Sequence, residues 1–418
     1  MELKRLLKEF PAEETAKLQR VGDTLAFAER HLVYPDYRLV ESAGTDPLAV
    51  IDGQEVVMLA CNDYLGLSRH PSVVEAIHAA ADAHGAGPGG TRIMCGNVAI
   101  LETLDAKVAE LVGCEDAITF PTGYMANLSV FNALLDPWFG LFPYRRGTAT
   151  VYADAHNHAT VHDGLRLSDA KRVLYKHDDL ADLEAKLAQH EGKGPRMIVT
   201  EGVWSVEGRI SPLPEVVAIA ERHGAILMID DAHGIGVLGE HGGGTLEHFG
   251  LTGRADLVMG SFDKALGGMG GFLAGKRDVI RWLRMAARAY VFSSAVPAIM
   301  AAGAIASIDA AREGKLLRRR LWRNAELLRH GLGGLGFRLF GDGSAPTVPV
   351  HVGPEELSMR FQRRLFELGV YAPAFRWPAT PKGEARIRAT PMASHETEHL
   401  ERALDAFRKA GRELGLIH

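Results

Sequence analysis

The sequence predicts an α/β fold, in which a large domain with a mostly parallel central sheet is followed by a smaller C-terminal α+β domain. Between about residues 62 and 295, short β-rich segments alternate with amphipathic helical segments, a pattern typical of a parallel sheet covered by helices. The 418 residues exceed the size of one typical core. We therefore expect an N-terminal arm over residues 1–60, a large domain over 61–299 and a small domain over 300–418.

The first 60 residues predict a helical arm that leads into the strand-like segment LAVIDGQEVVML. The chain begins MELKRLLKEFPAEE, which becomes acidic too early and lacks the apolar core of a signal peptide. The sequence also contains no run of about 18 apolar residues that could span a bilayer. These features favour a soluble protein.

The clearest repeating unit lies near the middle of the chain, where the strand RMIVTEG precedes the helix PEVVAIAERHG and the strand AILMID. Pro214 lies in the first turn of this helix and Gly224 at its end, as helix termini prefer. The second strand is apolar until its last residue, which predicts burial on both faces. Another strand, ADLVMGSF, follows and leads into a glycine-rich loop.

Beyond about residue 300 the pattern changes to that of the small domain. A long helical region from Ala301 to about His330 precedes the strand TVPVHVG, another helix, the strand RIRATPM and a final helix, HLERALDAFRKAGREL. The basic stretch from Lys315 to Arg323 alternates with leucines at helical spacing, so we interpret it as the exposed side of an amphipathic helix.

Composition excludes several classes of protein. The formal net charge is -5 and the isoelectric point is near 6.4, which argues against a general nucleic-acid-binding protein. Cys61, Cys95 and Cys114 are odd in number and form no CxxC pair. A disulfide framework is therefore not expected, and the cytoplasm is the expected location.

Two nucleotide-binding motifs match only in part. Gly85, Gly87 and Gly90 satisfy GxGxxG, but they follow a predicted helix where the dinucleotide motif requires a strand. Gly270, Gly275 and Lys276 begin a P-loop pattern that lacks its Ser or Thr. Neither motif predicts a nucleotide site.

A histidine cluster also invites a metal-site interpretation. His156, His158 and His162 lie close to Asp154 in sequence. His156 and His158 alternate as residues on one strand face do, but His162 falls in the next turn, and the spacing matches no zinc motif. We predict no metal.

The pattern that we consider significant is one suited to pyridoxal 5'-phosphate (PLP), which needs a lysine, an acid at its pyridine nitrogen, a stacking ring and a phosphate site. Asp230 ends a predicted parallel strand, where ligands of open α/β sheets bind, and His233 follows it. Lys264 lies after another strand end, three residues beyond Ser261.

The phosphate site and the stacking ring are predicted from two further segments. Thr122, Gly123 and Tyr124 lie between a strand and a helix, where free backbone N–H groups favour an anion. His158 offers a flat ring that could stack on the cofactor.

These segments resemble the α-oxoamine synthases, a family of fold-type I PLP enzymes that includes serine palmitoyltransferase, the oxononanoate synthase of biotin synthesis, aminoketobutyrate ligase and aminolevulinate synthase. The resemblance runs from about Leu59 to the C-terminus. The matching segments are, in order, CNDYLGLS, GGTRIMCGN, TGYMAN, DAHNHATVHDG, EGVWSVEGRISPLP, IDDAHGIGVLG, SFDKALGGMGGFLAG, FSSAVP and ARIRATPMASH.

The resemblance implies a PLP-dependent transferase fold of type I and a role for each matching residue. Lys264 would bind the cofactor and move protons, Asp230 would pair with the pyridine nitrogen, and His233 would contact the phenolic oxygen. His158 would stack on the ring. The remaining implied ligands are Gly123, Tyr124 and Ser261 for the phosphate, Ser294 from a second subunit, and Asn62, Ser205 and Arg388 for the substrate carboxylate.

Residue alternation alone leaves one of these assignments open. Arg386 lies two positions before Arg388, so in a strand both arginines share one face, and either could bind the carboxylate.

The implied reaction condenses a small amino acid (glycine, alanine or serine) with an acyl thioester, carried by coenzyme A or by a carrier protein, and releases the thiol and carbon dioxide. The family resemblance also implies a homodimer with the active site at its interface. An aminotransferase would use the same Asp230, His158 and Lys264, so it is the main alternative. A non-catalytic partner or PLP-dependent regulator is disfavoured, because Lys264 is present and the first 50 residues are too few for a DNA-binding domain.

The sequence departs from the family pattern at a few positions. Asp263 precedes the lysine where the family has Ser or Gly, Leu101 stands where a histidine is common, and Glu207 and Arg209 replace two aspartates. The connection after Asn127 is long and carries Pro137, Trp138, Phe139, Phe142 and Tyr144. Its aromatic residues could line an acyl channel, or they could pack on the domain or on a dimer partner. The cofactor residues are intact, so these departures leave open the identity of the substrates.

Overall fold

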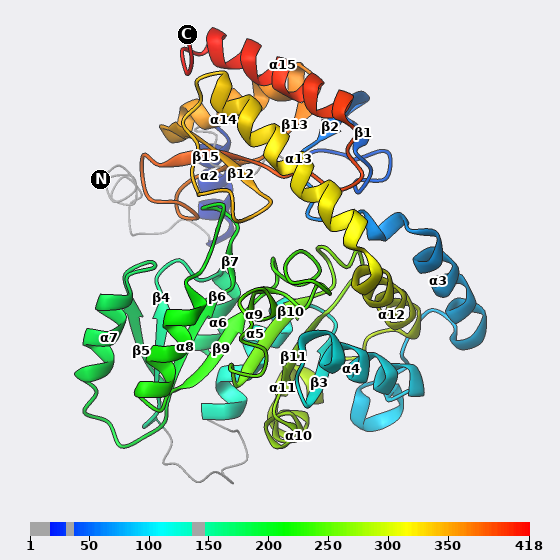
Figure 1. The fold of residues 1–418 in the computed structure, drawn as a ribbon, viewed down its shortest axis with the longest axis vertical. Coiled ribbons are helices and arrows are strands. Elements are labelled where there is room, and N and C mark those ends of the chain that lie inside the picture. Colours follow the sequence, from blue (N-terminus) through cyan, green and yellow to red (C-terminus); the bar gives the residue numbers. More distant parts are fainter. Residues whose placement is uncertain (1–16, 31–36, 136–146) are drawn as a thin grey trace.

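A computed structural model describes residues 17–30, 37–135 and 147–418 of the chain. One part is a large sheet between helices, and the other is a smaller group of helices and short sheets at one end of it (Figure 1). The first helix in the described residues is α2 (Lys17–Arg30). None of the helices in the described residues is long and apolar enough to cross a bilayer.

The central sheet has seven strands in the order β3-β11-β10-β9-β6-β4-β5. Only β11 runs antiparallel to its neighbours, and the other pairs are parallel. This confirms the predicted mostly parallel sheet. The strands are β3 (Asp116–Phe120), β4 (Thr150–Asp154), β5 (Lys171–Tyr175), β6 (Arg196–Glu201), β9 (Ile226–Asp230), β10 (Leu257–Ser261) and β11 (Gly271–Gly275).

Helices cover both faces of this sheet, as the apolar strands require. In β6, Ile198 packs into one hydrophobic cluster, while Met197 and Val199 pack into another. Because successive strand residues point to opposite faces, both faces of the strand are buried. The helices are α4 (Ala99–Val112), α5 (Gly123–Leu135), α6 (Ala159–Arg166), α7 (Leu180–Ala188), α8 (Leu213–Arg222), α9 (Thr245–His248), α10 (Arg277–Ala286) and α11 (Arg288–Val291).

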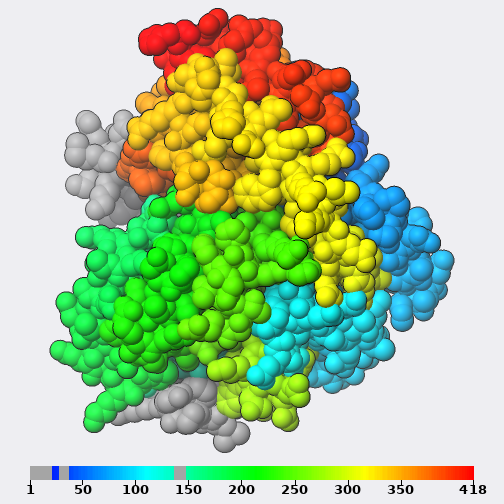
Figure 2. Space-filling model, in the orientation of Figure 1, coloured from blue at the N-terminus to red at the C-terminus, as the bar shows by residue number. Residues whose placement is uncertain are grey.

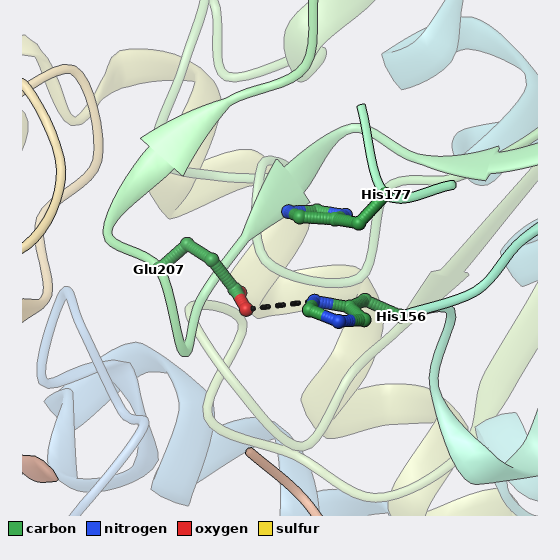
Figure 3. Close-up of side chains that lie close together, drawn as sticks. All are labelled: His156, His177 and Glu207. Carbon is green, nitrogen blue, oxygen red and sulfur yellow. Dashed lines mark hydrogen bonds and ion pairs between the residues drawn. The ribbon is translucent and has the colours of Figure 1, made fainter. Parts of the chain in front are cut away.

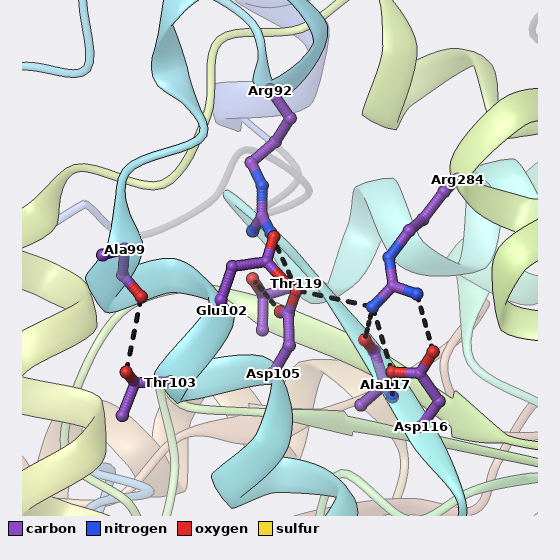
Figure 4. A network of polar contacts seen from close by, with 9 residues as sticks. All are labelled: Arg92, Ala99, Glu102, Thr103, Asp105, Asp116, Ala117, Thr119 and Arg284. Atoms are coloured by element: carbon purple, nitrogen blue, oxygen red, sulfur yellow. Dashed lines mark hydrogen bonds and ion pairs between the residues drawn. The ribbon is translucent and has the colours of Figure 1, made fainter. Parts of the chain in front are cut away.

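A partly buried ion-pair network ties β3 to two helices of this layer (Figure 4). Arg92 donates to Asp105 on α4 at 2.9 Å, and Arg284 on α10 donates to Asp116 on β3 at 2.6 Å. Arg284 also lies 3.8 Å from Asp105. Burial raises the pKa of Asp105 to about 6, even though Arg92 and Arg284 act to lower it.

The smaller part contains two three-stranded sheets. The hairpin of β1 (Leu48–Ile51) and β2 (Gln54–Met58) pairs with β13 (Val370–Tyr371), so residues from both ends of the chain share one sheet. The other sheet has the order β12-β15-β14. The remaining elements are β12 (Val348–Gly353), β14 (Ala374–Phe375), β15 (Ala385–Ala389), α14 (Glu355–Glu367) and α15 (Thr397–Glu413).

The long helical region predicted from Ala301 to about His330 is present, and Gly314 divides it into two helices. The first, α12 (Ala298–Glu313), packs against α3 (Pro71–His84) and α4, whereas α13 (Lys315–Gly334) packs against α15. Figure 2 shows this segment running from the smaller part down to the large one. This segment contacts both parts, so it does not fix where one domain ends and the next begins. The domain limits at residues 60 and 300 remain a prediction.

The basic stretch in α13 is also not fully exposed. Arg318 is buried and donates to the carbonyl oxygens of Ala311 and Glu240. The guanidinium therefore binds backbone carbonyls of the preceding helix and of a loop that is distant in sequence. The helical spacing of the basic residues does not reveal these contacts.

The structure agrees with the rejection of both nucleotide motifs. Gly85, Gly87 and Gly90 follow helix α3 rather than a strand. Residues 271–275 form strand β11, so no phosphate-binding loop lies there.

Candidate active site

The carboxyl ends of the parallel strands meet at one edge of the central sheet, where ligands of open α/β sheets bind. The strands β4, β6, β9 and β10 end at Asp154, Glu201, Asp230 and Ser261. The predicted site residues His158, Ser205, His233 and Lys264 each follow one of these ends by three or four positions.

Asp230 is held in a fixed orientation at the end of β9. Its side chain is only 7% exposed, and Asn127 on α5 donates to its Oδ2 at 2.8 Å. The backbone N–H of Ala232 donates to Oδ1 at 3.3 Å, and Asn127 donates also to Thr160 at 2.9 Å. A carboxylate has about four acceptor positions, so Asp230 can still accept a hydrogen bond from a ligand.

His158 forms the N-cap of α6 in the turn after β4. Its Nδ1 lies 2.9 Å from the Thr160 hydroxyl, and its backbone N–H donates to Glu201 at 2.6 Å. Burial lowers the pKa of His158 by more than Asp230 raises it, and Lys264 lowers it further. Asp230 and Lys264 therefore both lie close enough to the His158 ring to influence its pKa.

Lys264 lies in the turn after β10, with its side chain half-buried and its Nζ 3.5 Å from the Ser261 hydroxyl. Asp263, which sequence alone could not orient, is exposed. It is nevertheless near enough to His158 to raise the pKa of that ring.

A cradle of backbone atoms lies between α5 and the adjacent strands. The Thr122 hydroxyl accepts from Met125 N in the first turn of α5. A Cβ on Gly123 would come 3.4 Å from Ser261 Cβ, and one on Gly271 would come 2.4 Å from Gly123 Cα. Without side chains here, the free N–H groups of the helix terminus are accessible to an anion.

The side chain of Tyr124, the next residue of this segment, points toward α6. Its hydroxyl is partly exposed and donates to Asp163 on α6 at 2.8 Å.

Arg388 on β15 contacts the two other residues predicted to bind a carboxylate. Its Nη1 donates to Ser205 Oγ at 3.2 Å and its Nη2 to Asn62 Oδ1 at 3.1 Å. The guanidinium lies 4.5 Å from the Phe375 ring centre, and its buried Nε has no partner among the described residues.

Arg386, the alternative carboxylate ligand, has different neighbours. It donates to the Val206 carbonyl at 3.2 Å and stacks 3.8 Å from the Phe340 ring centre. Only Arg388 therefore lies against Ser205 and Asn62.

His233 is oriented by a residue that sequence reasoning did not select. Its Nδ1 lies 2.8 Å from the Tyr64 hydroxyl. Burial lowers the pKa of His233 well below its ordinary value, with Lys264 and Arg388 adding to the effect, and burial raises the pKa of Tyr64 to about 12. A neutral imidazole that accepts from Tyr64 at Nδ1 carries its proton on Nε2.

The other residues missed by sequence reasoning are also partners of predicted ones. Asn127 and Tyr64 lie inside the segments TGYMAN and CNDYLGLS, so their position in those segments was the available signal. Glu201 had none. Burial raises the pKa of Glu201 well above its ordinary value, and nearby Asp230 and Glu207 contribute.

The remaining predictions fall in three places. Ser294 is exposed between α11 and α12, and Leu101 is fully buried in the core. The aromatic residues 137–144 lie outside the described residues. The predicted strand face shared by His156 and His158 is wrong, because β4 ends at Asp154 and both histidines lie beyond it.

Comparisons with known proteins agree with the geometry. Residues 54–407 match the family model described as aminotransferase class I and II. The chain is 40% identical over 410 residues to an 8-amino-7-oxononanoate synthase of Thermoanaerobacter pseudethanolicus, which covers 98% of each protein. It is 36% identical over 402 residues to a 2-amino-3-ketobutyrate coenzyme A ligase of Salmonella typhimurium, covering 96% of this chain and 98% of the relative.

Solved structures give the same relationship. A serine palmitoyltransferase of Sphingomonas wittichii has a TM-score of 0.90 at 31% identity and covers 97% of this chain and 100% of its own. A serine palmitoyltransferase from S. paucimobilis with bound PLP and myriocin also has a TM-score of 0.90 at 31% identity, covering 96% of this chain and 100% of its own.

Proposed function

Because the chain belongs to the aminotransferase class I and II family and, within it, to the α-oxoamine synthases, we propose that it is a PLP-dependent acyltransferase. It condenses a small amino acid with an acyl thioester and releases the thiol and carbon dioxide, which leaves an α-aminoketone. The observation that carries this proposal is that Asp230, His158 and Lys264 gather at the carboxyl edge of one parallel sheet.

The residues at this edge fit PLP. Asp230 has an acceptor position free for a protonated pyridine nitrogen, and His158 offers a neutral ring for stacking. The glycine cradle at α5 suits a phosphate, with the Ser261 hydroxyl beside it. Lys264 would hold the cofactor covalently. When bound, PLP supplies an electron sink for negative charge at the α-carbon of the amino acid.

The substrate carboxylate is assigned to Arg388, Asn62 and Ser205. Nη1 and Nη2 of Arg388 donate to Ser205 and Asn62, and its Nε has no partner among the described residues. A guanidinium has five N–H donors, so Arg388 keeps the donors that a carboxylate needs for two parallel hydrogen bonds. This arrangement would orient the α-carbon toward the lysine.

Proton transfer is assigned to the Lys264 amine, which lies next to Ser261 and close to His158. We assign to this amine the removal of the α-proton of the amino acid and its return. When its Nδ1 accepts from Tyr64, His233 would donate a hydrogen bond from Nε2 to the cofactor's phenolic oxygen.

We propose further that the enzyme is a homodimer whose active site includes Ser294 of the second copy. The support is that Ser294 is exposed, next to the exposed Phe292, and that Ile93 and Met94 form another exposed apolar pair. A cytoplasmic location is proposed because all three cysteines are free.

The cofactor is tested by absorbance of the purified protein. We expect a visible band that borohydride removes, with the reduced cofactor mapped by peptide analysis to Lys264. Lys264→Ala should lose the band and all turnover. A colourless protein after PLP addition, or a label at another lysine, would contradict the proposal.

The reaction is tested with a panel of glycine, alanine and serine against acyl-CoA thioesters of increasing length, with acyl-carrier-protein thioesters included. We expect thiol release and carbon dioxide formation that depend on both substrates. An aminotransferase would instead convert an amino acid and a 2-oxo acid without thioester. Turnover of that kind would replace the proposed function with the alternative.

A further inference from the structure

A second group of polar side chains lies beside the active site and has no part in the chemistry above. It consists of His156 in the turn after β4, His177 after β5, and Glu207 in the loop after β7 (Val203–Trp204) (Figure 3). One ligand atom from each of the three lies within 4.8 Å of the others. Sequence spacing had suggested a different set, His156, His158 and His162, because it could not bring in residues from β5 and β7.

The orientation of His177 favours binding of a ligand. Its Nδ1 lies 3.0 Å from Oδ1 of Asp154, a fully buried carboxylate that ends β4. A carboxylate that accepts from one imidazole nitrogen leaves the lone pair on the other, as in metal sites with a carboxylate–histidine pair. The Nε2 of His177 is buried and has no hydrogen-bond partner among the described residues.

The other two side chains are accessible from solvent. The side chains of His156 and Glu207 are 34% and 17% exposed, and His156 Nδ1 lies 3.2 Å from Glu207 Oε1. Two imidazoles and one carboxylate are a ligand set that binds zinc, with the fourth position left to water. The nearby Asp178 is already paired with Arg209 at 2.7 Å, so it is not counted as a ligand.

The rings of His156 and His177 are stacked, with centroids 4.1 Å apart and planes 13° from parallel. A metal ion must lie in the plane of each ring that it binds, so two stacked rings cannot share one ion. The ring of His156 must therefore turn when the ion enters. Its position in an exposed turn allows this, whereas Asp154 and the edge of Trp204, 4.7 Å away, hold His177 in place.

We propose that His156, His177 and Glu207 form a binding site for a divalent cation of borderline softness, for which Zn²⁺ is the best match. Asp154 is a positioning residue for this site. The nitrogen ligands disfavour Mg²⁺ and Ca²⁺, which prefer oxygen.

Binding is tested by calorimetric titration of the PLP-loaded protein with Zn²⁺, in the absence of amino acids and phosphate, since both chelate the metal. We expect one Zn²⁺ per chain. His156→Ala and Glu207→Gln should each weaken binding at least tenfold, and Asp154→Asn roughly tenfold to a hundredfold. Co²⁺ should give the visible absorption of a four-coordinate site in the wild type, and His156→Ala should lose this absorption.

His241→Ala is the matched control. His241 lies 2.8 Å from Glu247, but no second imidazole completes a three-residue group there among the described residues. This variant should bind Zn²⁺ as the wild type does. The site is excluded if His156→Ala binds Zn²⁺ with unchanged affinity, or if His241→Ala loses as much. His156 is partly exposed, so its variant should fold even if Glu207→Gln does not.

Zn²⁺ bound at this site should also affect the active site, an expectation that rests on the proposed function. His156 lies two residues before His158, and Glu207 lies two residues after Ser205. We expect Zn²⁺ to lower turnover of the wild type and to leave His156→Ala unaffected. Equal inhibition of the wild type and His156→Ala would show that Zn²⁺ inhibits at another site. If Zn²⁺ binds the wild type without inhibiting it, the metal site stands but its effect on the active site is excluded.

Discussion

Three ionisable residues of the candidate active site are each held by neutral polar partners. Asn127 orients Asp230, Tyr64 orients His233, and Asn62 with Ser205 orients Arg388. Buried charges without partners are costly, and partners of this kind also fix the direction in which the charge faces. The site is thus ordered before any substrate arrives.

The two arginines of β15 provide a prediction at this scale. Arg388→Ala should raise the KM for the amino acid roughly tenfold to a hundredfold, because a charge-assisted hydrogen bond contributes about 1.5–3 kcal/mol. PLP affinity, measured by titration of the visible band, should change little.

Arg386→Ala is the control for this prediction, since Arg386 contacts Val206 and Phe340 instead of Ser205. Its KM for the amino acid should stay near that of the wild type. A larger effect of Arg386→Ala than of Arg388→Ala would reverse the assignment.

The elements of the site are brought together by close backbone contact. The antiparallel β11 passes so near the first turn of α5 that Gly271 and Gly123 touch. This contact sets the distance between the helix terminus and the end of β10, where Ser261 lies.

Gly271→Ala tests this contact. The added methyl group would meet backbone atoms of Gly123 and Thr122, which cannot turn aside as a side chain can. We expect a loss of about 1–3 kcal/mol in the free energy of unfolding, as overpacking causes, together with weaker PLP binding. Gly334→Ala, at a helix end with open space around it, should not destabilise; similar losses in both variants would argue against a special role for the contact.

A second element-scale contact joins α13 to the start of α15. Asn324 donates to the carbonyl oxygen of His395 at 2.8 Å, and His395 Nδ1 accepts from Met392 N at 2.9 Å. Burial lowers the pKa of His395 from 6.5 to about 4, with His399 contributing.

This shift predicts a pH dependence of stability. Unfolded chains bind a proton at His395 below about pH 6.5, but the folded protein binds it only near pH 4, so its stability is lost as the pH falls between these values. His395 by itself should contribute a loss of about 2 kcal/mol from pH 7 to pH 5, measured by urea unfolding as the difference between the wild type and His395→Asn. The exposed His248→Asn should keep the wild-type pH dependence; equal slopes in the wild type and in His395→Asn would refute the linkage.

At the scale of the whole molecule, the site is assembled from both parts of the chain. The central sheet carries Asp230, His158 and Lys264, whereas Arg388 comes from the small sheet β12-β15-β14. Asn62 follows β2, whose hairpin belongs to the sheet with β13. A change in the position of the smaller part would therefore alter substrate binding more than cofactor binding.

The proposed dimer makes a prediction at this scale. Chains carrying Lys264→Ala and chains carrying Ser294→Ala should each have low activity, because one lacks the lysine and the other weakens the phosphate site of its partner. Mixed and allowed to exchange subunits, they should regain activity, since hybrid dimers contain one intact site. Mass measurement should show that the mixtures contain hybrid dimers. If such mixtures do not regain activity, Ser294 does not belong to the active site of the partner subunit.

The sequence by itself determined the fold class and the family, and it predicted the residues of the cofactor site. Apolar strands alternating with helices specify a parallel sheet, and its carboxyl edge is where Asp230 and Lys264 must lie. These features depend on local periodicity and chain order, which a sequence displays directly. The same reasoning did not locate the break at Gly314 or the burial of Arg318, because both depend on what distant helices and loops pack against.

Tertiary structure alone decided which partners meet. Arg386 and Arg388 are equivalent in a strand pattern, and only the approach of Ser205 and Asn62 distinguishes them. Tyr64, Asn127 and the His177–Glu207 neighbours of His156 are likewise distant in sequence from the residues they contact. Side-chain contacts between separate strands and loops follow from how the sheet and the smaller part pack in three dimensions, and spacing along the chain does not encode that packing.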